Sequence, residues 1–212
     1  MKTKIYNAHQ LTEAQIAQLA ADLSAGAVAV FATDTVYGIG TGALCEPGIA
    51  RIYELKKRPA SQPLQLLTSD FLHVQQWVKF SPGALHVAQV FWPGALTLIV
   101  PPSEKGKVFL RGGKALGFRV PAYLPLLRIL AQMPMPLAST SANLHGSPTL
   151  TREEEVVKQF DTKVEYIVTD GTLSPLASTV LDATSPQANV LRTGNILEEE
   201  LLRVFKDTDD FV

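Results

Sequence analysis

The apolar residues near the N-terminus recur with the spacing of a helix. They form one stripe made of Ile16, Leu19, Ala20 and Leu23. The segment TEAQ at 12–15 has the arrangement of a capping box, and Gly26 follows the last apolar position. We therefore expect an amphipathic helix that begins after Thr12 and ends before Gly26.

Beyond that helix, short apolar runs alternate with amphipathic segments. The run AVAVFA at 27–32 contains no polar residue, which is typical of a strand that is covered on both faces. The segment between this run and position 47 reads as turn-rich, and 64–67 is a further apolar run. The same reasoning predicts helices at 47–57, 82–91 and 124–131, and strands at 96–100, 116–120, 137–140, 166–169, 178–181 and 190–192.

Capping residues predict where three helices begin. Ser81-Pro82 suits an N-cap and first helical position, TREE at 151–154 reads as a second capping box for a helix to Phe160, and Asn195 can cap a final amphipathic helix. No repeat or long linker divides the chain. We expect an α/β fold in one domain, 1–212, with a core at about 11–195, a C-terminal helix at about 196–206, and an open mixed parallel and antiparallel sheet with flanking helices.

Composition and charge narrow the function classes. The 212 residues are 46% hydrophobic and 18% charged, and 19 Lys and Arg stand against 20 Asp and Glu, a net charge of −1. Such a balance supplies no global field that would attract DNA or an anionic membrane. One cysteine, Cys45, a polar-interrupted N-terminus and the lack of an apolar run near ~20 residues predict a cytoplasmic protein without a membrane span.

Polar residues lie at the ends of four predicted strands. They are Thr33-Asp34-Thr35, Arg119, Ser139-Thr140-Ser141 and Ser178-Thr179. Ligands of open α/β sheets gather at the carboxyl ends of strands, so these side chains could hold a small polar ligand, with Arg119 binding a carboxylate or phosphate. The alternative is that serine and threonine simply begin turns.

Cations follow one predicted helix in the run KKRP at 56–59. Lys56 and Arg58 could project together into a cleft as a phosphate clamp, or they could only neutralise the helix C-terminus. Arg192 is a further candidate phosphate ligand, with ordinary surface charge as the alternative.

Other chemistries are disfavoured. The segment YGIGTG at 37–42 has GxGxG rather than GxGxxG spacing, and GxxxxGK[ST] is absent from the sequence. The four histidines have no ligand-like spacing, which makes a metal held wholly by protein improbable. A hydrolase triad of Ser141, His145 and Asp170 lacks a GxSxG elbow and is rejected.

Eight segments together resemble a known family. In chain order they are TDTVYGIG, KKRPASQPL, WPGALTLIV, FRVP, STSAN, GSPT, STVLD and VLRTG. In this order the chain resembles the YrdC-like threonylcarbamoyl-AMP synthase family over about 11–195, and in particular its short, single-domain branch. The resemblance implies a twisted sheet with a concave basic cleft.

It also implies an activity. Members condense L-threonine, bicarbonate or CO2, and ATP to threonylcarbamoyl-AMP and pyrophosphate, for threonylcarbamoyladenosine in tRNA. Mg2+ bound mainly through the ATP phosphates is the implied cofactor. A downstream tRNA threonylcarbamoyltransferase complex is the implied partner, and tRNA or double-stranded RNA could bind as well.

Matching positions receive roles by the same resemblance. Catalytic roles fall on Lys56, Arg58, Ser141 and Asn143. Threonine binding falls on Thr35, Arg119, Ser139 and Ser178. Nucleotide binding falls on Lys56, Arg58, Gln62, Ser141, Thr149 and Arg192. No residue is expected to ligate a metal.

The chain departs from the family pattern at four positions. Relatives often have Pro at Ala32, Asn at Gln62, His at Leu67 and Thr at Ala115; the missing histidine matches the short branch. The alternative function is a non-catalytic RNA-binding module of the same fold, with a basic surface that could be lined by Lys105, Lys107, Arg111 and Lys114.

Overall fold

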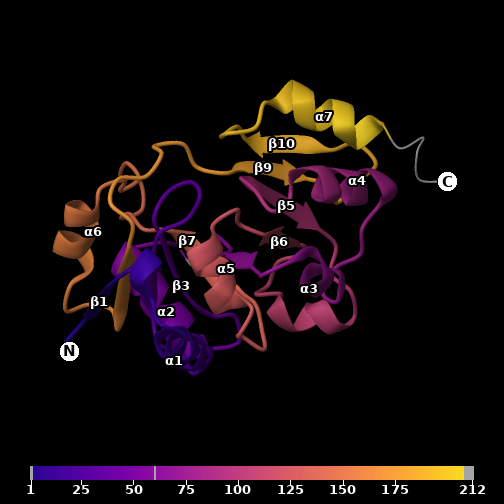
Figure 1. Cartoon of the computed structure of the whole chain (residues 1–212). Coiled ribbons are helices and arrows are strands. Elements are labelled where there is room, and N and C mark those ends of the chain that lie inside the picture. The colour runs from indigo at the N-terminus through magenta and orange to yellow at the C-terminus, as the bar shows by residue number, and fades with distance from the viewer. Residues whose placement is uncertain (1, 60, 208–212) are drawn as a thin grey trace.

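Helices pack around a single open sheet in the computed structural model, which describes residues 2–59 and 61–207 (Figure 1). In this described part the sheet has ten strands, in the order β1-β8-β2-β3-β7-β4-β6-β5-β9-β10. Their bounds are β1 Lys4–Asn7, β2 Ala29–Phe31, β3 Gly38–Gly42, β4 Gln65–Leu67, β5 Leu96–Val100, β6 Leu116–Arg119, β7 Leu137–Ser141, β8 Tyr166–Thr169, β9 Thr179–Asp182 and β10 Asn189–Arg192.

Both strand directions occur in this sheet. The pairs β1–β8, β2–β8, β4–β6 and β5–β9 are parallel, and the remaining pairs are antiparallel. Strands β8 and β9 run in clearly different directions in Figure 1, because each strand is rotated relative to its neighbour. The twisted, open, mixed sheet predicted from the sequence is confirmed.

Two hydrophobic clusters cover the two faces of the sheet. The helices are α1 Glu13–Ser24, α2 Glu46–Lys56, α3 Phe71–Gln75, α4 Pro82–Phe91, α5 Leu124–Leu130, α6 Glu153–Phe160 and α7 Glu198–Lys206, with short 3-10 turns at Ala8–Gln10 and Lys105–Phe109. Helices α1 and α5 share one cluster with Ala29 and Phe31, whereas α2, α4, α6 and α7 share the other with Val30. Strand β2 is therefore buried on both faces, as its unbroken apolar run predicts.

Two of the predicted helix caps are confirmed. The Gln15 backbone N–H donates to Thr12 Oγ1 (3.3 Å) while the Thr12 N–H donates to Gln15 Oε1 (2.8 Å), which completes the capping box of α1. Ser81 caps α4 by accepting from the Ala84 N–H (3.3 Å), and Pro82 is the first residue of that helix.

The other two predicted caps are wrong. Helix α6 begins at Glu153 with Arg152 as N-cap, because Arg152 bridges Thr172 and the Thr151 carbonyl accepts from Leu173, which keeps this segment extended. Helix α7 begins at Glu198 after Leu197 rather than after Asn195. Here the Thr179 hydroxyl accepts from the N–H groups of Gly194 and Ile196 and donates to the Ile196 carbonyl, so 194–196 form a loop.

Residues 38–42 form a buried strand, β3, within the segment predicted to be turn-rich. A Cβ at Gly38 would lie 2.7 Å from the Phe31 ring, and one at Gly40 would lie 2.8 Å from the Ala138 carbonyl oxygen. Glycine is therefore required by the close approach of the neighbouring strands. Strand β1 and helix α3 are also absent from the sequence prediction.

No helix within the described residues is long and apolar enough to cross a membrane. The single-domain division and the cytoplasmic location remain predictions.

Candidate functional site

A cavity of about 720 Å³ lies against one face of the sheet. Its lining includes pairs of residues two apart, whose side chains share a face of the sheet: Ser139 and Ser141, Gln65 and Leu67, Gly117 and Arg119, Thr97 and Ile99, and Ser178 and Val180. Three of the four predicted polar groups do lie at the carboxyl end of a strand: Thr33-Asp34-Thr35 after β2, Arg119 at the end of β6, and Ser139-Thr140-Ser141 at the end of β7. The prediction is wrong for Ser178, which precedes β9 at the amino end of that strand.

The lining of this cavity is cationic. It includes Arg58, Arg111, Arg119 and Arg192, and among the described residues no Asp or Glu lines it. Arg111 pairs with Glu46 (2.6 Å) and Arg119 with Asp34 (2.6 Å). Burial lowers the pKa of Arg192, and the charges of Arg119 and Arg58 lower it further, because the guanidinium groups repel one another. An anion would relieve that repulsion.

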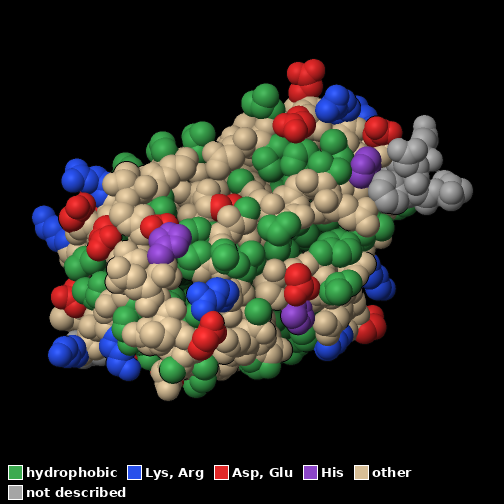
Figure 2. Space-filling model, in the orientation of Figure 1, with side chains coloured by type: hydrophobic (Ala, Val, Ile, Leu, Met, Phe, Trp, Pro, Cys, Tyr) green, Lys and Arg blue, Asp and Glu red, His purple; other side chains and the backbone are tan. Residues whose placement is uncertain are grey.

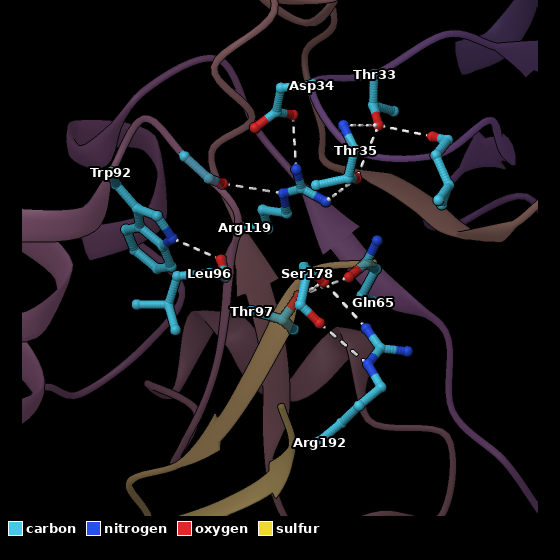
Figure 3. A network of polar contacts seen from close by, with 12 residues as sticks. Thr33, Asp34, Thr35, Gln65, Trp92, Leu96, Thr97, Arg119, Ser178 and Arg192 are labelled. Atoms are coloured by element: carbon cyan, nitrogen blue, oxygen red, sulfur yellow. Dashed lines mark hydrogen bonds and ion pairs between the residues drawn. The ribbon is translucent and has the colours of Figure 1, made fainter. Parts of the chain in front are cut away.

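Arg119 is fixed at one end of the cavity. It is 3% exposed, and its Nε donates to the Gly94 carbonyl (3.0 Å), Nη1 to Thr35 Oγ1 (3.0 Å) and Nη2 to Asp34 Oδ1 (2.6 Å) (Figure 3). Burial lowers the pKa of Arg119 and Asp34 raises it. Three of five N–H groups are used, and the others can form a planar fork for a carboxylate.

Arg58 and Arg192 have no carboxylate partner within the described residues. Arg58 donates to the Gln62 carbonyl (3.2 Å) and the Pro63 carbonyl (3.1 Å), and Arg192 donates to the Ser178 carbonyl and hydroxyl (both 3.0 Å). Their charges remain uncompensated by protein, which suits phosphate groups.

Lys56 does not project into the cavity beside Arg58. It is 2% exposed, and its Nζ donates to the main-chain carbonyls of Ser141 and Asn143 and lies 3.4 Å from Asn143 Oδ1. Burial, and to a lesser degree Arg58, lowers the pKa of Lys56 to about 8. The expectation that both cations reach into the cleft is wrong for Lys56, because its side chain turns inward and holds the segment 139–143.

Asn143 stabilises the same segment through hydrogen bonds of its side chain. Its Oδ1 accepts from Ser141 Oγ (2.6 Å), and its Nδ2 donates to the carbonyls of Leu144 (3.1 Å) and Ser147 (2.6 Å). Ser141 is thereby oriented at the cavity wall, whereas Asn143 is buried and does not line the cavity.

The structure brings together most of the site residues named from the sequence. Those that line the cavity are Thr35, Arg58, Gln62, Arg119, Ser139, Ser141, Ser178 and Arg192. Those that do not are Lys56, Asn143 and half-buried Thr149. Their individual roles stay predictions.

Of the basic residues considered for an RNA surface, only Arg111 lines the cavity. Lys105 lies over the Trp77 ring (4.2 Å to the centroid), and Lys107 pairs with Glu104 (2.8 Å).

Sequence reasoning missed two polar residues of the cavity floor, Gln65 and Thr97. Both interrupt apolar runs, PLQLL and ALTLIV, and a lone polar residue in a buried strand is the signal that could have identified them. Their hydroxyl and amide groups bond to each other (2.8 Å).

A metal site built from protein is not found in the described part of the chain, where no group of three or more His, Cys, Asp or Glu is placed to hold an ion. The cavity offers guanidinium groups instead. Guanidinium groups suit phosphate oxygens rather than a metal ion, and Mg2+ bound through ATP phosphates stays a prediction.

Comparisons with known proteins agree with this geometry. Residues 21–194 match the family model Sua5_yciO_yrdC, described as "Telomere recombination". The threonylcarbamoyl-AMP synthase of Pyrococcus abyssi is 37% identical over 182 residues, which cover 84% of this chain and 54% of that protein. That of Bacillus subtilis is 35% identical, with coverages of 88% and 55%. The chain therefore spans about half the length of these two relatives.

Solved structures extend the likeness to three dimensions. P. abyssi Sua5 complexed with L-threonine has a TM-score of 0.87 at 34% identity, covering 95% of this chain and 61% of that one. Escherichia coli YciO, at 23% identity, shares the fold with a TM-score of 0.82 and coverages of 91% and 96%. Since the family match covers most of the sequence and the fold agrees, the chain belongs to the Sua5, YciO and YrdC family.

Proposed function

We propose that the chain is an L-threonylcarbamoyladenylate synthase, which condenses L-threonine, bicarbonate or CO2, and ATP to threonylcarbamoyl-AMP and pyrophosphate. The observation that carries the proposal is one cavity in which a fixed, paired arginine (Arg119) and two unpaired arginines (Arg58 and Arg192) face the same space. Such a cavity can hold two different anions side by side. The names of the relatives above support the choice of reaction.

The threonine half is assigned to the end at Arg119. Its guanidinium would bind the carboxylate as a fork, and the hydroxyl oxygens of Thr35, Ser139 and Ser178 would accept hydrogen bonds from the amine and hydroxyl groups of threonine. Because Asp34 and Thr35 already fix Arg119, little side-chain entropy is lost when the ligand binds.

The nucleotide half is assigned to Arg58, Arg192, Gln62 and Ser141, which line the cavity. Lys56 and Asn143 act by holding the segment that carries Ser141. Thr149 does not line the cavity, so its contact with the nucleotide stays a prediction from the resemblance.

The chemistry needs positioning and charge rather than a protein nucleophile. The neutral threonine amine forms a C–N bond to the carbon of bicarbonate and water leaves, which gives a carbamate. A carbamate oxygen then bonds to the α-phosphorus, and pyrophosphate departs with the electrons of the broken P–O bond. Arg58 and Arg192 would offset the negative charge on the phosphoryl oxygens. Mg2+ bound to the phosphates would supply further charge compensation.

The product is a mixed anhydride and acylates nucleophiles. A reaction that transfers its acyl group to an amine of tRNA must therefore consume it, and a separate tRNA threonylcarbamoyltransferase complex is the proposed partner. Binding of tRNA or double-stranded RNA by this chain stays a prediction.

Mass spectrometry tests the proposed activity. Purified protein with ATP, Mg2+, L-threonine and bicarbonate should yield threonylcarbamoyl-AMP and one equivalent of pyrophosphate, and omission of threonine should abolish both. Arg119→Met should lose the product, whereas Arg128→Met, at a half-buried position of α5 outside the cavity, should retain it. Pyrophosphate release that does not depend on threonine, or no adduct at all, would overturn the proposal.

A further inference from the structure

A chain of hydrogen bonds crosses the floor of the cavity from β10 to β4. Arg192 Nη2 donates to Ser178 Oγ (3.0 Å), Ser178 Oγ lies 3.0 Å from Thr97 Oγ1, and Thr97 Oγ1 donates to Gln65 Oε1 (2.8 Å) (Figure 3). Ser178 and Thr97 are 3% and 4% exposed, so water competes little for these bonds.

The hydrogen bonds of this series all point in one direction, from Arg192 to Gln65. A hydroxyl group has a single hydrogen, and that of Thr97 is given to Gln65 Oε1. The Ser178 hydroxyl, which accepts from Arg192, must therefore donate to Thr97. Each bond polarises the next, beginning at the positive guanidinium. The carboxamide of Gln65 is consequently held with its oxygen toward Thr97 and its nitrogen pointing the other way.

The Gln65 amide nitrogen faces the cavity with both hydrogens unused. Among the described residues it has no hydrogen-bond partner, and Gln65 is half-buried in the cavity wall. On β4, Gln65 pairs in register with Ser139, and Leu67 two residues later pairs with Arg119. Figure 3 shows Gln65 between Arg119 and Arg192.

Only an acceptor can satisfy this group. The neighbouring arginines favour an anion, and a neutral amide adds two donors without adding charge. In the proposed reaction, the group that must lie between the amino-acid carboxylate at Arg119 and the phosphates at Arg58 and Arg192 is the carboxylate that comes from bicarbonate.

We propose that Gln65 binds the oxygens of bicarbonate, and of the carbamate formed from it, through its amide N–H groups. The assignment rests on the proposed function and adds a residue to it. In the step that Gln65 assists, the amine nitrogen bonds to the bicarbonate carbon, the C–OH bond breaks and water leaves, so no further reagent is needed. Gln65 is a substrate-contacting residue that lowers the concentration of bicarbonate required.

The sharpest test replaces the donors without changing shape. Gln65→Glu keeps an oxygen for Thr97 but turns a carboxylate toward the bound anion. Gln65→Met removes the donors without adding charge, and Gln75→Glu, on exposed α3 outside the cavity, adds the same charge as a control. We expect KM for bicarbonate to rise roughly 30-fold or more in both Gln65 variants, as for the loss of hydrogen bonds to a charged group.

The other substrates separate this role from a structural one. Calorimetry should show ATP binding, and threonine binding without bicarbonate, within about threefold of wild type in Gln65→Met. Thr97→Val, which frees the amide to rotate, should raise KM for bicarbonate by a smaller factor, roughly threefold to tenfold.

The outcomes are distinguishable. A wild type that makes threonylcarbamoyl-AMP while both Gln65 variants keep the wild-type KM for bicarbonate would overturn the role of Gln65 alone. Equal losses for all three substrates would also overturn it, because they would mark a general structural role. A wild type that makes no threonylcarbamoyl-AMP would remove the proposed function and this inference together.

Discussion

Arg119 and Arg192 line the same cavity but are held in opposite ways. Arg119 is 3% exposed, and Asp34 compensates its charge at 2.6 Å. Arg192 is far more exposed than Arg119, although its guanidinium is partly desolvated; it bonds to uncharged groups of Ser178 and shares its surroundings with the positive charge of Arg58. One end of the cavity therefore offers a fixed geometry, and the other offers net positive charge.

This contrast suits two different anions. A carboxylate is small and planar, so a preorganised fork can select it. A triphosphate carries several negative charges, so it needs uncompensated positive charge more than one fixed planar fork. The surface drawn in Figure 2 carries Lys and Arg side chains scattered among Asp and Glu, in keeping with a net charge of −1. The cationic character is thus local to the cavity.

Breaking the fixed end should have the largest effect. Arg119→Met leaves the Asp34 carboxylate without its partner, and we expect a loss of about 3–5 kcal/mol in the free energy of unfolding, measured by urea denaturation, together with loss of threonine binding. Adding Asp34→Asn should restore most of the stability but none of the threonine binding. Retained threonine binding in Arg119→Met would contradict the assignment.

Lys56 sharpens the comparison, because it is buried like Arg119 but lacks a carboxylate partner among the described residues. Its pKa of about 8 lies below the usual 10.5, so between these values the unfolded chain keeps a proton that the native protein has released. Native stability relative to Lys56→Met should therefore rise by about 3 kcal/mol from pH 8 to 10.5 and fall as pH is lowered through that window. A pH-independent difference would show that the ammonium keeps its ordinary pKa.

At the positively charged end of the cavity, formed by Arg58 and Arg192, substitutions should weaken ligand binding but leave the stability of the fold nearly unchanged. Arg58→Met and Arg192→Met should weaken ATP binding by roughly 10-fold to 100-fold, as expected for a lost charged hydrogen bond. The free energy of unfolding should change by less than about 1 kcal/mol, since no buried charge is left unpaired. Calorimetry measures ATP binding and urea denaturation measures stability on the same samples. A loss of stability as large as that in Arg119→Met would show that Arg58 or Arg192 has a structural role.

A change of ionic strength should have the smallest effect, and it should act on KM for ATP more than on KM for threonine. Raising salt from about 50 to 500 mM shortens the screening length severalfold, so KM for ATP should rise a fewfold while KM for threonine stays within about twofold. Equal responses of the two substrates would remove the distinction between the two ends.

The sequence carries the information that is local. The helix at 13–24 follows from the stripe and capping box, and the buried strand β2 from an unbroken apolar run. Strand β3 could not be predicted in this way, because its glycines are explained by Phe31 and Ala138 on neighbouring strands. The caps at Thr151 and Asn195 fail for the same reason, since long-range partners hold those segments in other conformations.

The site residues also separate into those that local sequence predicts and those whose position depends on distant parts of the chain. Thr35, Arg119, Ser139 and Ser178 stand out as polar residues beside apolar strands, and they do line one cavity. The inward turn of Lys56 depends on the carbonyl groups of 141 and 143, some 85 residues further along the chain. The bond between Thr97 and Gln65 depends on β4, β6 and β5 lying side by side, which only the strand order reveals.

A structure with both ligands tests the central claim most directly. Crystals grown with L-threonine and a non-hydrolysable ATP analogue should show both in this cavity, with the threonine carboxylate on Arg119 and the phosphates on Arg58 and Arg192. Phosphates on Arg119, or either ligand bound outside the cavity, would contradict the account.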